Sequence, residues 1–319
     1  MKTNRRNFIS SSVTAVAGMS LIRPMHAYSM ISPSDKVNVG FIGVRNMGFG
    51  DLRSHLATGQ VNCTGLCDID RNLLEKRAAD VQKDFGQTPK LYSDFRELLE
   101  NKDLDAVIVG TPDHWHCLMT VYACQAGLDV YVEKPMANAI EECNLIVKAA
   151  KRYNRIVQVG QQQRSGEHWQ KINSMVKEGR IGKLRKVNIW GNFNYGVGAP
   201  KQPDQPVPEG VDYDMWLGPA PERNFNKNRF HGMWRMFWDY GGGVMTDWGV
   251  HLIDMALWIK DLTAPPRSIM ASGGNLSFED HDHEAFDTMS VIFDLDDFVV
   301  TWDQTSGTEK GPWDKNYGL

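Results

Sequence analysis

Three features that are common in other proteins are scarce here, and each absence excludes a class of protein. The five cysteines are odd in number and none forms a Cys-x-x-Cys pair, so we predict neither a zinc site nor a disulfide framework. No stretch of about 20 uninterrupted apolar residues occurs, and we therefore predict no membrane span. The net charge of −4 provides no basic surface for nucleic acid or anionic lipid.

The composition is that of a soluble globular protein. Hydrophobic residues make up 42% of the chain and charged residues 23%. The 319 residues exceed one ordinary core and are enough for two domains. Most of the ten tryptophans follow residue 160. Their rings either fill a core or stack on sugar rings, and the sequence leaves both interpretations open.

The first 30 residues are predicted to be an export signal and not part of the fold. Arg5 and Arg6 form a twin arginine, and a weakly apolar stretch covers residues 13–22. This low hydrophobicity is typical of a twin-arginine signal, whose route exports folded proteins and would let an enzyme bind its cofactor first. An ordinary secretory signal and a disordered cytoplasmic tail are the alternatives. We expect an exported, periplasmic protein.

A glycine turn follows the first predicted strand, which ends at Ile42. The dinucleotide-binding pattern Gly-x-Gly-x-x-Gly uses its glycines for a tight turn, close approach of the pyrophosphate and close helix packing. Gly43 and Gly48 hold the first and third places, whereas Arg45 holds the second. The arginine would push the pyrophosphate outward, bend around it, or pair with a phosphate. The pattern is correspondingly weaker than usual.

An acidic residue stands where such a site binds the ribose. Asp68 ends the predicted strand 61–67, twenty residues after Gly48. Its carboxylate favours NAD over NADP, although the nearby Arg71 could soften that preference and leaves NADP possible. The alternative for Asp68 is an N-cap of the next helix, predicted at 73–81.

Strands and helices alternate through the first half of the chain. Apolar strands are predicted at 104–109, 129–132 and 156–159, with helices at 117–126 and 140–152. This alternation predicts an α/β protein with a doubly wound parallel sheet, whose ligands bind at the carboxyl ends of the strands. We assign residues 35–160 to a Rossmann NAD(P)-binding domain and residues 161–319 to an α/β domain for substrate binding and oligomerisation.

For the second half of the chain the sequence predicts four more strands and a helix that carries candidate site residues. The strands are predicted at 184–193, 267–275, 288–294 and 298–305. The crossing 196–221 is too long for a bare connection, and we expect it to contact substrate or another subunit. Three glycines precede a helix that begins near Val244, on which Asp247 and His251 share one face. Such a polar face is either functional or simply solvated.

These motifs together resemble the Gfo/Idh/MocA family of oxidoreductases, over about residues 36 to 319. The marks are the glycine turn, Asp68, Thr111-Pro112-x-x-x-His116, Glu133-Lys134-Pro135 and Asp247-x-x-x-His251. The resemblance implies a Rossmann domain followed by an α/β domain with an open, mostly antiparallel sheet. It implies catalytic roles for Lys134, Asp247 and His251. It also implies further strands beyond Leu319, hence a truncated product, and a homo-oligomer, either dimer or tetramer.

The predicted site residues follow from these motifs. The cofactor residues are Gly43, Arg45, Asn46, Met47, Gly48, Asp68, Thr111, Pro112, His116, Glu133 and Lys134. The substrate candidates are Arg164, His168, Trp238 and Asp239, with Trp234 as part of the same aromatic platform. Residues 281–284, His-Asp-His-Glu, are all potential metal ligands. We nevertheless favour a solvated loop for this segment and predict no metal.

We predict an enzyme that moves a hydride between a secondary hydroxyl of a sugar, glycoside or cyclic polyol and a tightly bound NAD. His251 would be the base, since an imidazole titrates near neutral pH, and Asp247 would orient it or bind an adjacent hydroxyl. Lys134 would stabilise negative charge on the reacting oxygen, or share the proton transfer if its pKa is depressed. The first alternative is a redox-assisted glycosidase or lyase that restores its NAD. Hydrolytic members of the family depart from the Glu-Lys-Pro pattern, which this chain keeps. A non-catalytic sugar or dinucleotide sensor is the second alternative.

Overall fold

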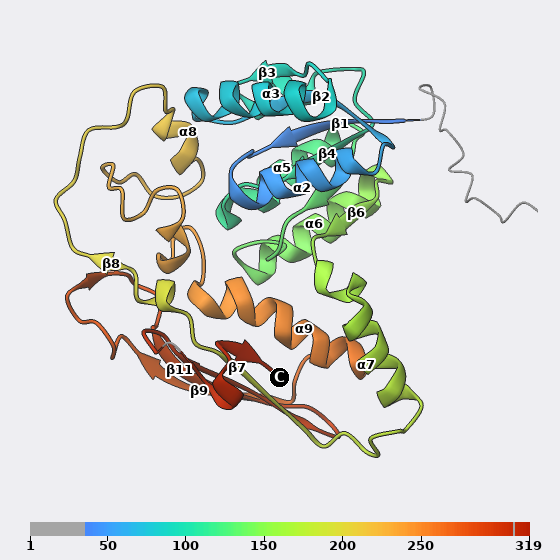
Figure 1. Ribbon diagram of the computed structural model, residues 1–319, viewed down its shortest axis with the longest axis vertical. Helices are drawn as coiled ribbons and strands as arrows, with labels where there is room; N and C mark the ends of the chain where they lie inside the picture. The colour runs from blue at the N-terminus through green and yellow to red at the C-terminus, as the bar shows by residue number, and fades with distance from the viewer. Residues whose placement is uncertain (1–35, 309) are drawn as a thin grey trace, which may run out of the picture. The chain divides into compact units, whose positions relative to one another are not determined.

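The computed structural model describes residues 36–308 and 310–319 (Figure 1). The predicted export signal at 1–30 lies outside the described residues. The described part forms a six-stranded sheet in its first half, and a five-stranded sheet and a small two-stranded one in its second half. No helix in this part of the chain is long and apolar enough to cross a membrane.

The first sheet is the predicted Rossmann sheet. Its six strands are all parallel, in the order β3-β2-β1-β4-β5-β6, which is that of a dinucleotide-binding fold. The strands are β1 (Val37–Ile42), β2 (Val61–Cys67), β3 (Lys90–Tyr92), β4 (Ala106–Val109), β5 (Asp129–Val132) and β6 (Val157–Val159). The helices are α2 (Asn46–Ala57), α3 (Arg71–Phe85), α4 (Phe95–Leu99), α5 (Asp113–Gln125) and α6 (Ile140–Tyr153). Apolar side chains on both faces of β1 and β4 form the core, because helices cover both faces.

Helix α5 begins four residues earlier than predicted. Pro112 is its N-cap, with φ −60° and ψ 153°. Proline fixes its own φ, and Asp113 in the first turn interacts well with the helix dipole. The first turn therefore carries Asp113 and His116 into the fold instead of leaving them in a loop.

The second sheet is mixed, with mostly antiparallel pairs. Its strand order is β13-β7-β12-β11-β9. Among the described strand pairs of this second sheet, only β7 and β12 run parallel. The strands are β7 (Lys186–Gly191), β9 (Ser268–Gly274), β11 (Thr288–Asp294), β12 (Val299–Thr305) and β13 (Tyr317–Gly318). Helix α9 (Val250–Ile259) packs on one face, with α7 (Glu167–Lys177) beside it (Figure 1). The predicted fold class is confirmed.

The long crossing is ordered by contacts with the first domain. It contains a 3-10 turn (Asn194–Val197), β8 (Ala199–Pro200) and α8 (Tyr213–Leu217), and β8 pairs with β10 (His281–Asp282). The Arg71 N–H donates to the Gly210 carbonyl and the Asp212 N–H donates to the Ile69 carbonyl, both at 2.9 Å. The crossing is thereby tied to the loop that follows β2.

Candidate functional site

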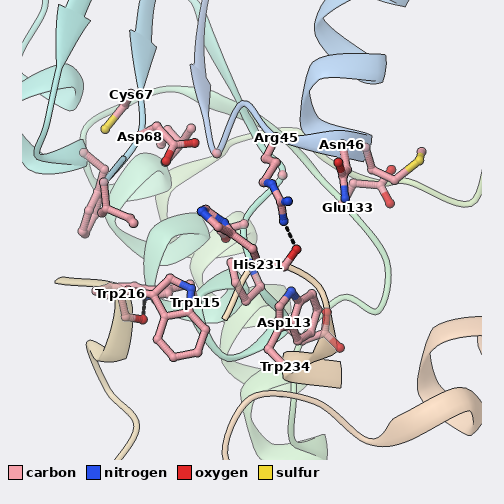
Figure 2. Close-up of a pocket in the computed structure, with 18 of the residues that line it drawn as sticks. Arg45, Asn46, Cys67, Asp68, Asp113, Trp115, Glu133, Trp216, His231 and Trp234 are labelled. Carbon is pink, nitrogen blue, oxygen red and sulfur yellow. Dashed lines mark hydrogen bonds between the residues drawn. The ribbon is translucent and has the colours of Figure 1, made fainter. Parts of the chain in front are cut away.

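A cavity lies where the carboxyl ends of the first sheet meet segments of the second domain (Figure 2). Nine of the eleven predicted cofactor residues line it: Gly43, Arg45, Asn46, Met47, Asp68, Thr111, Pro112, Glu133 and Lys134. The second domain contributes Met215, Trp216, His231, Trp234 and Arg235. Asp68 lies on one side of the cavity in Figure 2, and Trp234 and Asp113 lie on the other.

The glycine turn has the shape that a pyrophosphate needs. Gly43 has a φ of +80°, and a Cβ on it would lie 2.9 Å from the Gly110 carbonyl. A Cβ on Gly48 would overlap the Gly43 carbonyl oxygen, so this glycine lets α2 pack directly on the turn. The first and third glycines therefore do what the dinucleotide pattern requires of them.

Arg45 reaches across the cavity to the second domain. Its Nη1 donates a hydrogen bond to the His231 carbonyl oxygen (Figure 2). The His231 imidazole in turn lies 3.2 Å from the Asp70 carboxylate. The Arg45 side chain therefore ties the two domains together, a contact that the sequence did not predict.

Asp68 is not the helix N-cap. Its carboxylate accepts hydrogen bonds from the backbone N–H groups of Val44, at 2.9 Å, and Asp70, at 3.0 Å. Asp70 caps α3 instead, because its side chain accepts from the Leu73 N–H at 3.2 Å. Burial raises the pKa of Asp68. The acid thus holds the glycine turn in place and lines the cavity next to it.

His116 differs from its predicted role. Its ring nitrogens lie 2.7 Å from the Pro135 carbonyl oxygen and 2.9 Å from the Thr111 carbonyl oxygen. The side chain is buried, and within the described part of the chain it does not line the cavity. His116 therefore braces two loops of the cavity wall, because the early start of α5 turns it inward.

Two of the predicted catalytic residues, Lys134 of the first domain and Asp247 of the second, are in direct contact. Lys134 Nζ lies 2.7 Å from Asp247 Oδ1 and donates a second hydrogen bond, also of 2.7 Å, to the Asp247 carbonyl oxygen. Arg235 Nε lies 3.0 Å from the same Oδ1, and the Tyr195 hydroxyl donates to Oδ2 at 2.7 Å. Burial by itself would raise the pKa of Asp247, but Arg235 and Lys134 outweigh it and hold that pKa well below its usual value. Asp247 is therefore an ionised acceptor surrounded by three donors.

His251 is a weaker base than the sequence suggested. It lies on α9 one turn after Asp247, with 5% of its surface exposed. Burial, and secondarily the Lys134 ammonium, lowers the pKa of His251 to about 4. Its Nδ1 is buried and has no hydrogen-bond partner among the described residues. The imidazole is consequently neutral at pH 7 and able to accept a proton.

Sequence reasoning missed Tyr195, Arg235 and Asp113. Burial, and then Asp247, raises the pKa of Tyr195, so its hydroxyl stays protonated. Burial also raises the pKa of Asp113 well above its usual value. Arg235 stacks on the adjacent Trp234, with Cζ 4.2 Å from the ring centroid. The only indication of Arg235 in the sequence is its position next to Trp234, which was predicted to be part of an aromatic platform.

The four predicted substrate residues are elsewhere in the second domain. Arg164 makes two hydrogen bonds to Asp254, at 2.8 and 2.6 Å, and Asp239 lies 2.5 Å from Arg223. Trp238 is half exposed, and His168 is exposed at the start of α7. None of the four, all within the described range, lines the cavity that contains Lys134. Trp234 does line it.

The His-Asp-His-Glu segment is not the solvated loop that was expected. Its first two residues form β10, and His283 is buried with its Nε2 3.2 Å from the Asp287 carboxylate. In the part of the chain that the structure describes, no group of three or more potential metal ligands gathers.

Two family models match this chain. The model described as "Oxidoreductase family, NAD-binding Rossmann fold" covers residues 37–161. The one described as "Oxidoreductase family, C-terminal alpha/beta domain" covers residues 165–276. Both are domains of the Gfo/Idh/MocA family.

Among curated proteins, the chain is similar to a glycosyl hydrolase family 109 protein of Shewanella baltica, at 29% identity over 202 residues. That match covers 57% of this chain and 44% of the relative. An alpha-N-acetylgalactosaminidase of Shewanella oneidensis is 29% identical over 160 residues, 49% of this chain and 35% of the relative. The chain therefore spans less than half the length of these relatives.

Solved structures share the fold. The WlbA dehydrogenase from Bordetella pertussis, in complex with NADH and UDP-GlcNAcA, has a TM-score of 0.64 at 20% identity, covering 85% of this chain and 67% of that one. The myo-inositol 2-dehydrogenase from Lactobacillus plantarum has a TM-score of 0.65 at 21% identity, covering 85% and 70%. The chain thus carries both domains of the Gfo/Idh/MocA oxidoreductase family, an NAD-binding Rossmann domain followed by the C-terminal α/β domain.

Proposed function

We propose that the protein transfers a hydride between the carbon of a secondary hydroxyl, in a sugar, glycoside or cyclic polyol, and a tightly bound NAD. The observation that carries this proposal is the contact of 2.7 Å between Asp247 Oδ1 and the Nζ of Lys134, a residue that lines the cavity next to the glycine turn. Two side chains 113 residues apart meet there, each from a different domain. Structural neighbours described as dehydrogenases add support for the class of reaction.

The cavity residues fit NAD. The glycine turn leaves room for a pyrophosphate, and Glu133, which lines the cavity, has a buried Oε1 with no partner among the described residues. When bound, NAD supplies the group that accepts or returns the hydride. Residues 231–235 and the crossing lie over the cavity, tied down by Arg45 and by the backbone bonds of Arg71 and Asp212. Those ties favour a cofactor that stays bound between turnovers.

The side chains then have distinct roles in alcohol oxidation. Lys134 donates a hydrogen bond to the reacting oxygen and stabilises the negative charge that develops there. Asp247 orients the ammonium through two hydrogen bonds, one to its carboxylate and one to its carbonyl oxygen. His251 accepts the hydroxyl proton on Nε2, the ring nitrogen opposite the buried Nδ1, as the C–H hydride leaves.

The test is a hydride assay on the purified chain with its retained cofactor and added NAD. A panel of sugars, glycosides and polyols is added while nicotinamide absorbance is followed and the products are analysed. We expect reduction of the cofactor together with a keto product from at least one compound class. A wild-type chain that binds neither NAD nor NADH would refute the proposal.

A redox-assisted glycosidase is the second candidate, and the names of the curated relatives favour it. In that reaction a ring hydroxyl is oxidised to a ketone, the neighbouring C–H loses a proton and the leaving group departs to give an unsaturated ketone. Water then adds to the double bond, and the ketone is reduced again. The protonated Tyr195 would supply an acid for the leaving group. The same assay in deuterated water separates the two: bond cleavage with deuterium at the neighbouring carbon and no net reduction supports the glycosidase.

We also propose that residues 1–30 direct the protein to the periplasm by the twin-arginine route. Changing Arg5 and Arg6 to lysine together should leave the protein in the cytoplasmic fraction, because the twin arginine is what the route recognises. Cell fractionation with antibody detection measures this. Unchanged export of the double variant would point to an ordinary secretory signal, and wild-type protein in the cytoplasm would refute export.

A homo-oligomer is part of the same proposal. The outer side of the second sheet exposes Met270 and Ile292, which lie opposite each other on neighbouring strands, with 65% and 40% of their surfaces accessible. Exposed apolar side chains gathered on a sheet face are typical of contact surfaces, and a second copy of the chain would cover them.

A further inference from the structure

We propose that Arg235 shifts the bound cofactor toward its reduced form, by adding a positive charge beside the nicotinamide. The inference rests on the proposed function, in which NAD occupies the cavity. It concerns the equilibrium between the two oxidation states of the bound cofactor and not the identity of the substrate. In this proposal Arg235 acts on the cofactor through its positive charge.

The position of Arg235 follows from its contacts. It lines the cavity together with Trp234, Glu133 and Lys134. Asp68, the acid that follows β2, lies on one side of the cavity in Figure 2, and Trp234, the neighbour of Arg235 in the sequence, lies on the other. In a Rossmann domain the acid faces the adenosine ribose and the turn faces the pyrophosphate. The end that contains Lys134 and Arg235 is therefore left for the nicotinamide half.

The Arg235 guanidinium is held in place by its neighbours, but not all of its nitrogens have hydrogen-bond partners among the described residues. Nε lies 3.0 Å from Asp247 Oδ1, and Cζ lies 4.2 Å from the Trp234 ring centroid. Nη1 lies 3.5 Å from the Gly232 carbonyl oxygen, and Nη2 has no hydrogen-bond partner among the residues described. Aromatic stacking and one ion pair fix the side chain, while its outer edge stays available to the cavity.

The surrounding charges do not cancel this guanidinium. Lys134 is a second cation, and Asp247 is the one carboxylate kept ionised by both of them. Burial raises the pKa of Asp113 well above its usual value, which favours the neutral form of that acid. Burial likewise raises the pKa of Glu133 to about 7, which leaves it about half ionised. The imidazoles of His116 and His251 have lowered pKa values and are neutral.

The sign of the effect follows from the cofactor's own charge. The oxidised nicotinamide ring is a cation and the reduced ring is neutral, so a nearby fixed cation destabilises the oxidised form selectively. In a cavity sheltered from water this repulsion is much less screened than in solution. Arg235 should thus raise the reduction potential of the bound couple and make bound NAD a stronger hydride acceptor.

The measurement is the reduction potential of the cofactor bound to the holoenzyme, by equilibration with redox dyes while nicotinamide absorbance is followed. For Arg235→Gln we expect the ratio of oxidised to reduced bound cofactor at a given potential to rise on the order of tenfold, about 30 mV for a two-electron couple. Arg235→Lys keeps the charge and should recover most of the wild-type potential. Asp247→Asn removes a negative charge and should move the potential in the opposite direction.

Arg229→Gln is the matched control. Arg229 lies in the same segment, stacks 6.0 Å from the Phe237 ring centroid and pairs with Asp204 at 3.7 Å, and it does not line the cavity. An unchanged potential in Arg235→Gln, or an equal change in Arg229→Gln, would overturn the inference while leaving the proposed function intact. If Arg235→Gln does not fold, a fall in potential for Asp247→Asn overturns it too. A wild-type chain without bound or added dinucleotide would overturn both.

Discussion

Replacing Lys134 with methionine is expected to lower kcat by about a hundredfold to a thousandfold, while the affinity for NAD changes by about threefold or less. The ammonium is the donor that the proposed mechanism places on the reacting oxygen. Methionine fills similar space, and Asp247 keeps Arg235 and Tyr195 as donors, so the site remains paired. Steady-state kinetics on the best substrate of the panel, with NAD binding measured separately, gives both quantities.

Lys151→Met provides the matched control for this variant. Lys151 is exposed in the last turn of α6, outside the cavity. It loses the same charge and should keep wild-type kcat. A Lys134→Met enzyme with nearly normal kcat would remove Lys134 from the chemistry, and one that fails to hold NAD would make it a cofactor ligand instead.

Replacing Gly48 with alanine is expected to weaken NAD binding by about a hundredfold or more, which is roughly 3 kcal/mol. A Cβ at this position would overlap the Gly43 carbonyl oxygen and lie 3.3 Å from the Gly110 carbonyl oxygen. Both atoms belong to backbone that cannot move without opening the turn. The dissociation constant for NAD, measured by calorimetry, reports the loss directly.

Gly50→Ala tests whether this effect belongs to the turn or to helix α2 in general. Gly50 lies in the same helix, and a Cβ there would have nothing within 4 Å among the described atoms. Alanine favours helices more than glycine does, so this variant should be at least as stable as the wild type and bind NAD normally. Equal losses in the two variants would show that the helix, and not the approach of Gly48 to the turn, controls binding.

The first sheet could be read from the sequence because its signals are local. Buried parallel strands are continuous apolar runs, and β4 and β5 appear as such in the sequence. Gly43 and Gly48 indicate the turn in the sequence. Glycine is required at Gly43 because of its positive φ, and at Gly48 because of its close packing on the turn. The helix start at Asp113 was misplaced, since the N-cap function of Pro112 has a weak signature.

The candidate site depended on contacts that no local pattern encodes. Arg45 looked like a defect in the glycine pattern, and its bond to His231, 186 residues away, shows a tie between domains. Tyr195 and Arg235 carry no motif, yet both contact Asp247. The sequence by itself determined the Rossmann sheet, the glycine turn and the residue types of the motifs for which we propose catalytic roles. Only the tertiary structure decided which donors surround Asp247 and which residues reach the cavity, because those contacts depend on how the second domain packs against the carboxyl ends of the first sheet.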